Sequence, residues 1–257
     1  MLKLGIVGIS GRMGHALYDS IVGMDGLKLC CGIDSNVQSL PIGCTVEVAP
    51  SVQELKTLPQ MFIDFTRPQC SLEVLRFAAD HGIAYVLGTT GFDEAGKAEI
   101  AACAKKIPLV MASNFSVGVN LLLALVKETS AIMQDADIEI VEAHHRYKVD
   151  APSGTALSLG EAAAAGRGVE LKDVMVAGRN GITGERQYGT IGFSSVRGGD
   201  IVGDHSVMFC ADGELVELKH HASSRATFAR GALRAARWLE GRAPGLYGMP
   251  QVLGLNG

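Results

Sequence analysis

The segment EIVEAHHRYKVDAPSGTA, residues 139–156, gathers two histidines, a lysine and an aspartate ahead of a proline–serine–glycine–threonine run. Histidine titrates near neutral pH, and a lysine ammonium can stabilise developing negative charge. The alternation of apolar and polar residues in DIEIVEA predicts a strand, which places His144 and His145 at or just beyond its end. Lys148 follows on a predicted loop, because Asp150 and a proline lie close behind it. This combination suits proton transfer to a substrate that carries negative charge.

The residues after this loop predict the start of a helix. Pro152 fits a first-turn position, and Ser153, Gly154 and Thr155 are expected to present free backbone N–H groups. A helix N-terminus of this kind binds anions, so a small carboxylate-bearing substrate would fit beside Lys148.

Two other interpretations of the histidine–lysine segment stay open. His144, His145 and Asp150 could bind a metal ion, although adjacent histidines point in different directions and no third ligand has a familiar spacing. Alternatively, the segment is structural, with hydrogen-bonded histidines and a solvated lysine. No metal is expected, and the pair His220 and His221 is expected on a surface or interface.

The run GISGRMG places Gly8, Gly11 and Gly14 between a predicted strand and a predicted helix. Glycines let a backbone approach a pyrophosphate closely, and Asp34 follows about 20 residues on, where a ribose-binding carboxylate belongs. The pattern predicts a dinucleotide site, with a plain tight turn as the alternative. A carboxylate at Asp34 followed by Ser35 favours NADH over NADPH, although Arg12 could still reach a phosphate.

Strand and helix patterns alternate through the first part of the chain. Apolar runs at 2–8, 27–34, 61–66, 83–90 and 107–114 predict strands, and residues 12–23, 68–82 and 93–106 predict the helices between them. This order predicts a Rossmann-like α/β domain with a parallel sheet. GTTGF (88–92) and ASNFS (112–116) end two of these strands, where ligands of such sheets bind; helix capping by Thr90 or Ser113 is the alternative.

The pattern changes after Asn114. An apolar helix over 116–133, a strand over 137–145, a helix from about Ser153 and a hairpin over 205–222 turning at Asp212-Gly213 predict an α+β domain with a mixed or antiparallel sheet. The expected domains are residues 1–115, completed by 226–257, for the dinucleotide, and residues 116–225 for substrate binding and oligomerisation.

Composition excludes several classes of function. The net charge of −4 argues against binding a nucleic-acid backbone, and no run of about 18 apolar residues predicts a membrane span. We identify no signal-peptide pattern, so a cytoplasmic location is expected. None of the six cysteines forms a C-x-x-C pair, which predicts reduced thiols.

The segments EAHHRYKVDAPSGTA, GISGRMG, DFTRP, GTTGF and ASNFSVGVN together resemble the 4-hydroxy-tetrahydrodipicolinate reductase (dihydrodipicolinate reductase) family of diaminopimelate and lysine biosynthesis. The resemblance runs from the first predicted strand to the last helix. The sequence departs from many members in its short segment after Asp34 and in Ser35, where some members carry an arginine linked to NADP use. Only the cofactor preference is put in doubt.

The resemblance assigns roles to individual residues. It implies His144 as proton donor and acceptor, Lys148 as a second proton donor, and His145, Gly154 and Thr155 as substrate-binding residues. The cofactor-binding segments that it implies are Gly8, Ile9, Ser10, Gly11, Arg12 and Met13; Asp34; Gly88, Thr89 and Thr90; and Ala112, Ser113, Asn114 and Phe115.

The family resemblance also implies a reaction and an assembly. The reaction is the NADH- or NADPH-dependent reduction of a cyclic dicarboxylate after loss of water, in a homotetramer assembled through the second domain. Another NAD-dependent dehydrogenase of a small carboxylate would keep the glycine loop without needing HHRYKVDAPSGT. A non-catalytic NAD-responsive regulator is the third class.

Overall fold

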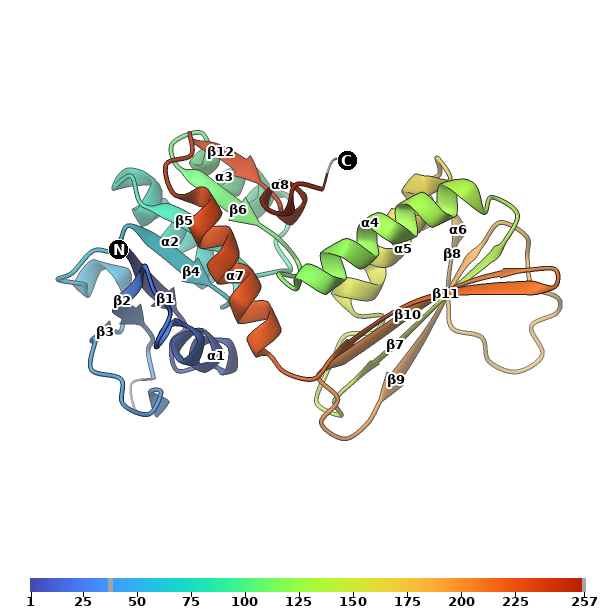
Figure 1. Cartoon of the computed structure of the whole chain (residues 1–257), viewed down its shortest axis with the longest axis horizontal. Coiled ribbons are helices and arrows are strands. Elements are labelled where there is room, and N and C mark those ends of the chain that lie inside the picture. Colours follow the sequence, from blue (N-terminus) through green and yellow to red (C-terminus); the bar gives the residue numbers. More distant parts are fainter. Residues whose placement is uncertain (37–38, 256–257) are drawn as a thin grey trace. The chain divides into compact units, whose positions relative to one another are not determined.

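In the computed structural model, which describes residues 1–36 and 39–255, seven strands form one parallel sheet in the first part of the chain (Figure 1). Their order across the sheet is β12-β6-β5-β4-β1-β2-β3. They are β1 (Leu2–Val7), β2 (Leu27–Ile33), β3 (Glu47–Ala49), β4 (Met61–Asp64), β5 (Ala84–Leu87), β6 (Pro108–Met111) and β12 (Gly245–Tyr247).

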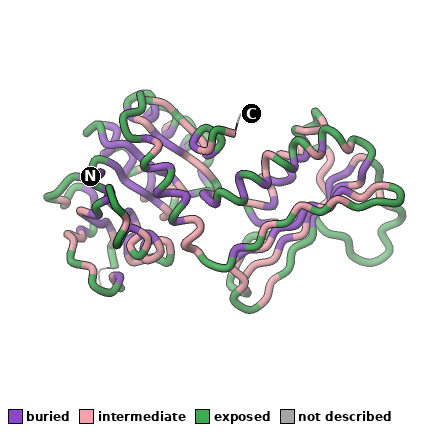
Figure 2. Tube along the Cα trace, in the orientation of Figure 1, coloured by how far each residue is buried: buried purple, intermediate pink, exposed green. Residues whose placement is uncertain are grey.

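Helices cover both faces of this sheet, which explains why its central strands are almost entirely buried. Every residue of β4 and β5 is buried, as Figure 2 shows in purple. One core packs α1 (Arg12–Ile21) and α7 (Ala226–Leu239) on the sheet, and the opposite core packs α2 (Pro68–Asp80) and α3 (Glu94–Ala104). A short 3₁₀ helix, η2 (Val52–Glu54), and α8 (Met249–Leu253) complete the elements of this unit.

The strand order reverses between β1 and β4. Strands β2 and β3 extend the sheet on one side of β1, whereas β4, β5 and β6 extend it on the other. The helices that follow β1 and β4 therefore lie on opposite faces, and the carboxyl ends of two such strands are the point where open parallel sheets bind ligands. Gly8 and Thr66, one and two residues beyond the ends of their strands, lie at this point.

The second unit has a mixed five-stranded sheet in the order β11-β10-β7-β9-β8, counted over the same described ranges. Strand β7 is parallel to β9 and antiparallel to β10, and the hairpin of β10 and β11 turns at Gly213, whose φ is 84°. The strands are β7 (Asp137–His144), β8 (Met175–Ala177), β9 (Ile191–Arg197), β10 (Gly203–Ala211) and β11 (Glu214–Ala222), and the helices are α4 (Val117–Ile132), α5 (Gly154–Gly166) and α6 (Leu171–Val174).

The core of the second unit lies between its sheet and helices α4 and α5. It includes Leu122 and Val126 of α4, Leu159 of α5, and Ile140 and Phe193 of the sheet. The other face of the sheet carries partly exposed apolar residues, among them Val196 and Leu215.

The chain divides into Met1–Ser116 with the segment that begins at Arg225, and Val117–Ser224. Residues 256 and 257 of the expected C-terminal segment lie outside the described residues. Helix α7 packs against α1, and a side-chain carbon at Gly231 would lie 1.7 Å from the Phe115 carbonyl oxygen, so only glycine allows this approach. Among the described residues, no helix is long and apolar enough to cross a membrane.

The predicted fold class, a parallel Rossmann-like sheet followed by a mixed sheet, is confirmed. Two local expectations are wrong. Pro152 precedes the cap of α5 instead of lying in its first turn, because Ser153 is the cap. The Ser153 amide is not free, since it donates a hydrogen bond to Glu142.

Candidate active site

Strand β7 ends with two ionisable side chains on the same face. Residues two apart on a strand share a face, and Glu142 and His144 both point to the side covered by α5. The Glu142 side chain is only 1% exposed, and its Oε2 lies 2.6 Å from His144 Nδ1. The His144 side chain is 12% exposed, so it is not fully enclosed by the protein.

Glu142 is the centre of a hydrogen-bonded cluster. Arg197, at the end of β9, donates from Nη1 and Nη2 to the two carboxylate oxygens over 2.8 and 2.7 Å. The Ser153 amide donates to Oε1 over 3.2 Å. Burial alone would raise the pKa of Glu142, but hydrogen bonds from Arg197, Ser195 and His144 lower it to about 2. Glu142 is therefore ionised at neutral pH and can only accept hydrogen bonds.

An ionised Glu142 determines how His144 carries its protons. The Nδ1 atom must hold a hydrogen to donate to the carboxylate, which leaves Nε2 as the atom that exchanges a proton. The pKa of His144 lies below 6.5: burial is the largest cause and lowers it, the hydrogen bond and charge of Glu142 raise it, and the charges of Lys148 and Arg197 lower it further. A side-chain carbon at Gly203 would lie 3.1 Å from Nε2, so this glycine keeps the space beside the ring open.

Lys148 lies on the loop between β7 and α5. Its Nζ is 2.8 Å from Asp150 Oδ1, and the backbone oxygen of Asp150 accepts a hydrogen bond of 2.7 Å from Arg197. The Arg197 guanidinium thus fixes both the loop and Glu142. The Asp150 side chain is 54% exposed, so another anion could replace its carboxylate beside Lys148.

The start of α5 is tied to the same cluster through Ser153. Its hydroxyl accepts the Ala156 amide over 3.2 Å as the N-cap and lies 3.1 Å from His205 Nε2. The His205 ring packs edge-on against His144, with 5.1 Å between ring centres. Burial, followed by the charge of His144, lowers the pKa of His205 to about 4, so this histidine is neutral at physiological pH.

In the first unit, the glycine loop lies between β1 and α1. Gly8 has a φ of 76°, and a side-chain carbon at Gly14 would lie 2.3 Å from the Gly8 carbonyl oxygen. Gly11 caps α1 without a side-chain hydrogen bond, so the helix N-terminus is uncapped by a side chain. Ile9 is fully buried in the core, which leaves only its backbone for a ligand.

Asp34 follows β2 directly and holds the neighbouring loops. Its Oδ2 accepts a hydrogen bond from the Ser10 amide and its Oδ1 accepts one from the Asn36 amide, each over 2.9 Å. The carboxylate is half-buried, Ser35 beside it is exposed, and Arg12 at the first position of α1 is exposed. The negative charge of Asp34 therefore lies against the glycine loop.

Two further strand ends carry the remaining predicted residues. Gly88, Thr89 and Thr90 follow β5; Thr89 is buried and Thr90 is exposed. Ala112, Ser113, Asn114 and Phe115 follow β6; Phe115 is buried against Phe65, with 5.4 Å between ring centres. Figure 1 shows that these ends lie on the edge of the sheet where β1 and β4 also end.

These loops fit a dinucleotide. The positive φ of Gly8, the close approach at Gly14 and the uncapped start of α1 leave a backbone surface at the switch point of the sheet. Gly8, Gly11 and the half-buried Asp34 are the residues that would hold a pyrophosphate and a ribose there.

Profiles of one protein family match almost the whole chain. "Dihydrodipicolinate reductase, N-terminus" matches residues 2–115, and "Dihydrodipicolinate reductase, C-terminus" matches residues 118–253. The chain belongs to the dihydrodipicolinate reductase family. It is 52% identical over 265 residues to a 4-hydroxy-tetrahydrodipicolinate reductase from Thiobacillus denitrificans, with 99% of each chain covered.

Solved structures show the same fold at lower sequence identity. A dipicolinate-bound dihydrodipicolinate reductase from Paenisporosarcina sp. TG-14 is 24% identical, with a TM-score of 0.77 over 96% of this chain and 97% of that one. A probable dehydrogenase from Thermotoga maritima is 10% identical, with a TM-score of 0.66 over 98% and 92% of the two chains.

The structure brings His144, Lys148 and the start of α5 together in this reductase-family chain, around two residues that the sequence interpretation missed. Glu142 had a usable signal, because it lies two residues before His144 in an alternating strand. Arg197 had none, since it is 55 residues away in sequence and reaches Glu142 only through the pairing of β9 with β7. His145 is half-buried, and its ring lies near that of Tyr147, with 6.2 Å between ring centres.

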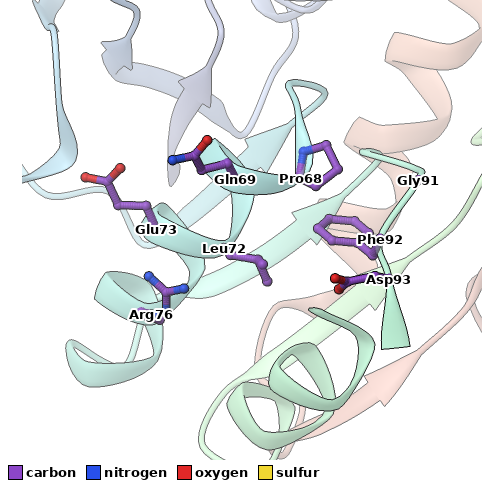
Figure 3. A pocket seen from close by; sticks show the side chains of 8 residues that line it. All are labelled: Pro68, Gln69, Leu72, Glu73, Arg76, Gly91, Phe92 and Asp93. Carbon is purple, nitrogen blue, oxygen red and sulfur yellow. The ribbon is translucent and has the colours of Figure 1, made fainter. Parts of the chain in front are cut away.

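The surface of the first unit also has a hollow of about 510 Å³ (Figure 3). None of the predicted site residues lines it. Its walls come from α2 and the loop after β5: Pro68, Gln69, Leu72, Glu73, Arg76, Gly91, Phe92 and Asp93.

Among the residues described, no group of three histidine, cysteine, aspartate or glutamate side chains is arranged to hold a metal ion.

Proposed function

We propose that the chain catalyses the NAD(P)H-dependent reduction of 4-hydroxy-tetrahydrodipicolinate, with loss of water, to tetrahydrodipicolinate. The hydrogen bond between His144 and the buried Glu142, next to Lys148 and the start of α5, is the observation that carries this proposal. The 52% identity to a reductase of that name supports the choice of substrate. No observation favours another dehydrogenase or a regulator.

His144 acts as the proton donor. The chemistry that a reduced nicotinamide supplies when bound is a hydride for the conjugated ring of the substrate. The ring then needs a proton on carbon, and His144 can deliver it from Nε2 while Nδ1 keeps its hydrogen bond to Glu142. Glu142 stabilises the imidazolium that must form before each transfer.

Lys148 and the start of α5 bind the two carboxylates of the substrate. The Asp150 carboxylate, 2.8 Å from Lys148 Nζ, occupies a position that a substrate carboxylate would take. Gly154 and Thr155 are the first residues of α5, where backbone N–H groups and the helix dipole favour an anion. His145 contributes to the same substrate site.

Binding of the dicarboxylate should also raise the fraction of His144 that is protonated. The pKa of His144 lies below 6.5 without substrate, so most of the imidazole is neutral at pH 7. Two substrate carboxylates near the ring would raise this pKa, because opposite charges favour the protonated form. The substrate therefore helps to charge the group that protonates it.

The proposed cofactor is NADH in preference to NADPH. The Asp34 carboxylate would accept hydrogen bonds from ribose hydroxyls and repel a 2′-phosphate. Arg12 favours NADPH instead. Burial is the first cause that lowers the pKa of Arg225 and the charge of Arg12 is the second, so the two guanidinium groups lie near each other. A phosphate between these two arginines would relieve their repulsion. The cofactor contacts proposed are those at Gly8–Met13, Asp34, Gly88–Thr90 and Ala112–Phe115.

The proposed assembly is a homotetramer built on the second sheet. The face of that sheet away from α4 and α5 carries Val196, 49% exposed, and Leu215, 56% exposed. Val196→Glu would place a charge on this face and should lower the mass measured by sedimentation below that of a tetramer. An unchanged tetramer would place the interface elsewhere.

The cytoplasmic location stays a prediction.

The deciding assay follows the oxidation of NADH and of NADPH at 340 nm, with the substrate produced in place by a synthase from pyruvate and aspartate semialdehyde. Oxidation that requires the synthase product supports the proposed reaction, and the ratio of the two rates tests Asp34. Oxidation with a different carboxylate alone would favour another dehydrogenase. Folded protein that binds nucleotide without turnover on any substrate would favour a regulator.

A further inference from the structure

Asp64 is a fully buried carboxylate that the proposed reaction does not use. It ends β4 beside β1 and β5, next to the point where the strand order reverses. Burying an ionised carboxylate is costly unless its oxygens accept hydrogen bonds. The donors to Asp64 come from the loops that follow β4 and β5 and from Tyr85 within β5.

The Oδ1 atom of Asp64 holds both loops. It accepts hydrogen bonds from the Thr66 amide over 2.8 Å and from the Thr66 hydroxyl over 2.7 Å, and it lies 3.3 Å from the Thr89 hydroxyl oxygen. The Thr89 oxygen in turn accepts the Thr66 amide over 2.9 Å and the Ser71 hydroxyl over 2.7 Å. One carboxylate oxygen thus links the loops that follow β4 and β5.

The linked loops press directly on the predicted cofactor edge. A side-chain carbon at Gly8 would lie 2.6 Å from Thr66 Cγ2, and one at Gly88 would lie 2.2 Å from the Phe65 ring. The positions of Thr66 and Phe65 therefore limit where the backbones of Gly8 and Gly88 can lie. Both glycines belong to segments that we assign to the dinucleotide.

The Oδ2 atom of Asp64 faces the protein interior instead. It accepts a hydrogen bond of 2.7 Å from the hydroxyl of Tyr85, which is fully buried within β5. This hydroxyl stabilises the carboxylate without touching the glycine loop or the Thr66 loop. A substitution at Tyr85 therefore changes the stability of the buried carboxylate and leaves the hydrogen bonds between Asp64 and the loops in place.

We propose that Asp64 is a positioning residue for the nicotinamide cofactor: it holds Thr66 against Gly8 and joins the Thr66 and Thr89 loops at the switch point of the sheet. The inference rests on the proposed function, which assigns this edge to the dinucleotide. A purely structural Asp64 would affect stability alone, whereas a positioning Asp64 affects nucleotide affinity beyond its effect on stability.

The test measures the Kd of the preferred nucleotide by fluorescence titration for the wild type and for Asp64→Ala, Asp64→Asn and Tyr85→Phe. Asp64→Ala should raise the Kd about tenfold. This corresponds to roughly 1.4 kcal/mol, the usual net contribution of one hydrogen bond. Asp64→Asn should restore most of the affinity, because its amide oxygen can face Thr66 while its nitrogen donates to Tyr85. Tyr85→Phe should lower the melting temperature and leave the Kd within about twofold of the wild type.

Steady-state kinetics should also show that the variants affect nucleotide binding and not dicarboxylate binding. At saturating nucleotide, the KM for the dicarboxylate should stay within about twofold in every variant, since its proposed ligands lie in the second unit. If Asp64→Ala does not fold, Thr66→Val, which removes the hydroxyl bond and keeps a methyl beside Gly8, should raise the Kd about threefold.

Wild-type affinity in folded Asp64→Ala or in Thr66→Val overturns the inference and leaves the proposed reductase standing. Equal weakening by Tyr85→Phe and Asp64→Ala would also overturn it, because stability alone would then explain both. A wild-type protein that binds neither NADH nor NADPH would refute the proposed function, and the inference with it.

Discussion

At the scale of single residues, the proposed mechanism depends on the orientation of one imidazole, that of His144. Replacing His144 with Asn removes the proton that Nε2 delivers while keeping a polar side chain beside Glu142. We expect kcat to fall by about 10² to 10⁴, the usual contribution of a general acid, with the Kd of the nucleotide unchanged. His221→Asn is the matched control, because that histidine is exposed on β11 and pairs with Asp204. Equal kcat values for the two variants would contradict the assignment.

The charge of Glu142 should be visible in the pH dependence. In the proposed mechanism the protonated His144 is the active form, and its pKa in the free enzyme lies below 6.5, with burial as the largest cause. The kcat/KM value should therefore decline about tenfold per pH unit as pH rises above that pKa. Glu142→Gln withdraws the charge that favours the imidazolium, so the decline should begin at lower pH.

The control for this profile is Asp204→Asn, which removes a carboxylate from the same unit that pairs with the exposed His221. Its profile should match that of the wild type. A kcat/KM that does not vary between pH 5 and pH 7.5, or a profile that Glu142→Gln leaves in place, would show that another group donates the proton.

How far the sequence predicts the site depends on sequence separation. His144, Lys148, Gly154 and Thr155 lie in one segment, so a local pattern was enough to select them. Arg197 comes from a different strand, and only the parallel register of β9 against β7 pairs it with the end of that segment. The glycine loop was predictable because its backbone geometry needs glycine, whereas the roles of Asp64 and Thr89 depend on hydrogen bonds between separate strands.

At the scale of elements, the N-cap of α5 joins stability to substrate binding. Ser153→Ala removes the cap and the hydroxyl beside His205, which should lower the free energy of unfolding by about 1 to 2 kcal/mol. Because α5 begins at the proposed carboxylate site, the KM for the dicarboxylate should also rise, by about fivefold for each kcal/mol lost there.

Helix α3 provides the control for this cap. Asp93 Oδ1 accepts the Gly96 amide over 2.8 Å as its N-cap, in the other unit. Asp93→Ala should show a similar loss of stability, measured by denaturant titration, and no change in the KM for the dicarboxylate. A KM that rises equally in both variants would mean that α5 has no special role in binding.

Long, regular elements followed from the sequence, and short ones did not. The hairpin of β10 and β11 has two nine-residue strands joined at an Asp-Gly turn, and α4 has a long apolar pattern. Strands β3, β8 and β12 have three residues each, too few for a period to be detected. They form because a neighbouring strand offers hydrogen-bonding groups, which is a property of the folded sheet.

At the scale of the whole molecule, acid should weaken the two units to different extents. The histidines with lowered pKa values, His144, His205 and His220, all lie in Val117–Ser224. A buried histidine with a depressed pKa stabilises the folded state fully above its unfolded pKa of about 6.5 and loses that contribution as pH falls toward the folded value. For His205, whose folded pKa is about 4, the window is pH 6.5 to 4.

The loss from His205 alone should approach about 3 kcal/mol at pH 4, since each pKa unit corresponds to about 1.4 kcal/mol. Hydrogen exchange followed by mass spectrometry should show protection of β7 and β10 declining between pH 7 and pH 5, after correction for intrinsic exchange rates. The fluorescence of Trp238, the single tryptophan, reports on α7 in the first unit and should change little over this range. His205→Gln should remove much of the pH dependence of β7 and β10. Equal loss of protection in both units, or a His205→Gln variant as acid-sensitive as the wild type, would mean that the buried histidines do not control the acid stability of the second unit.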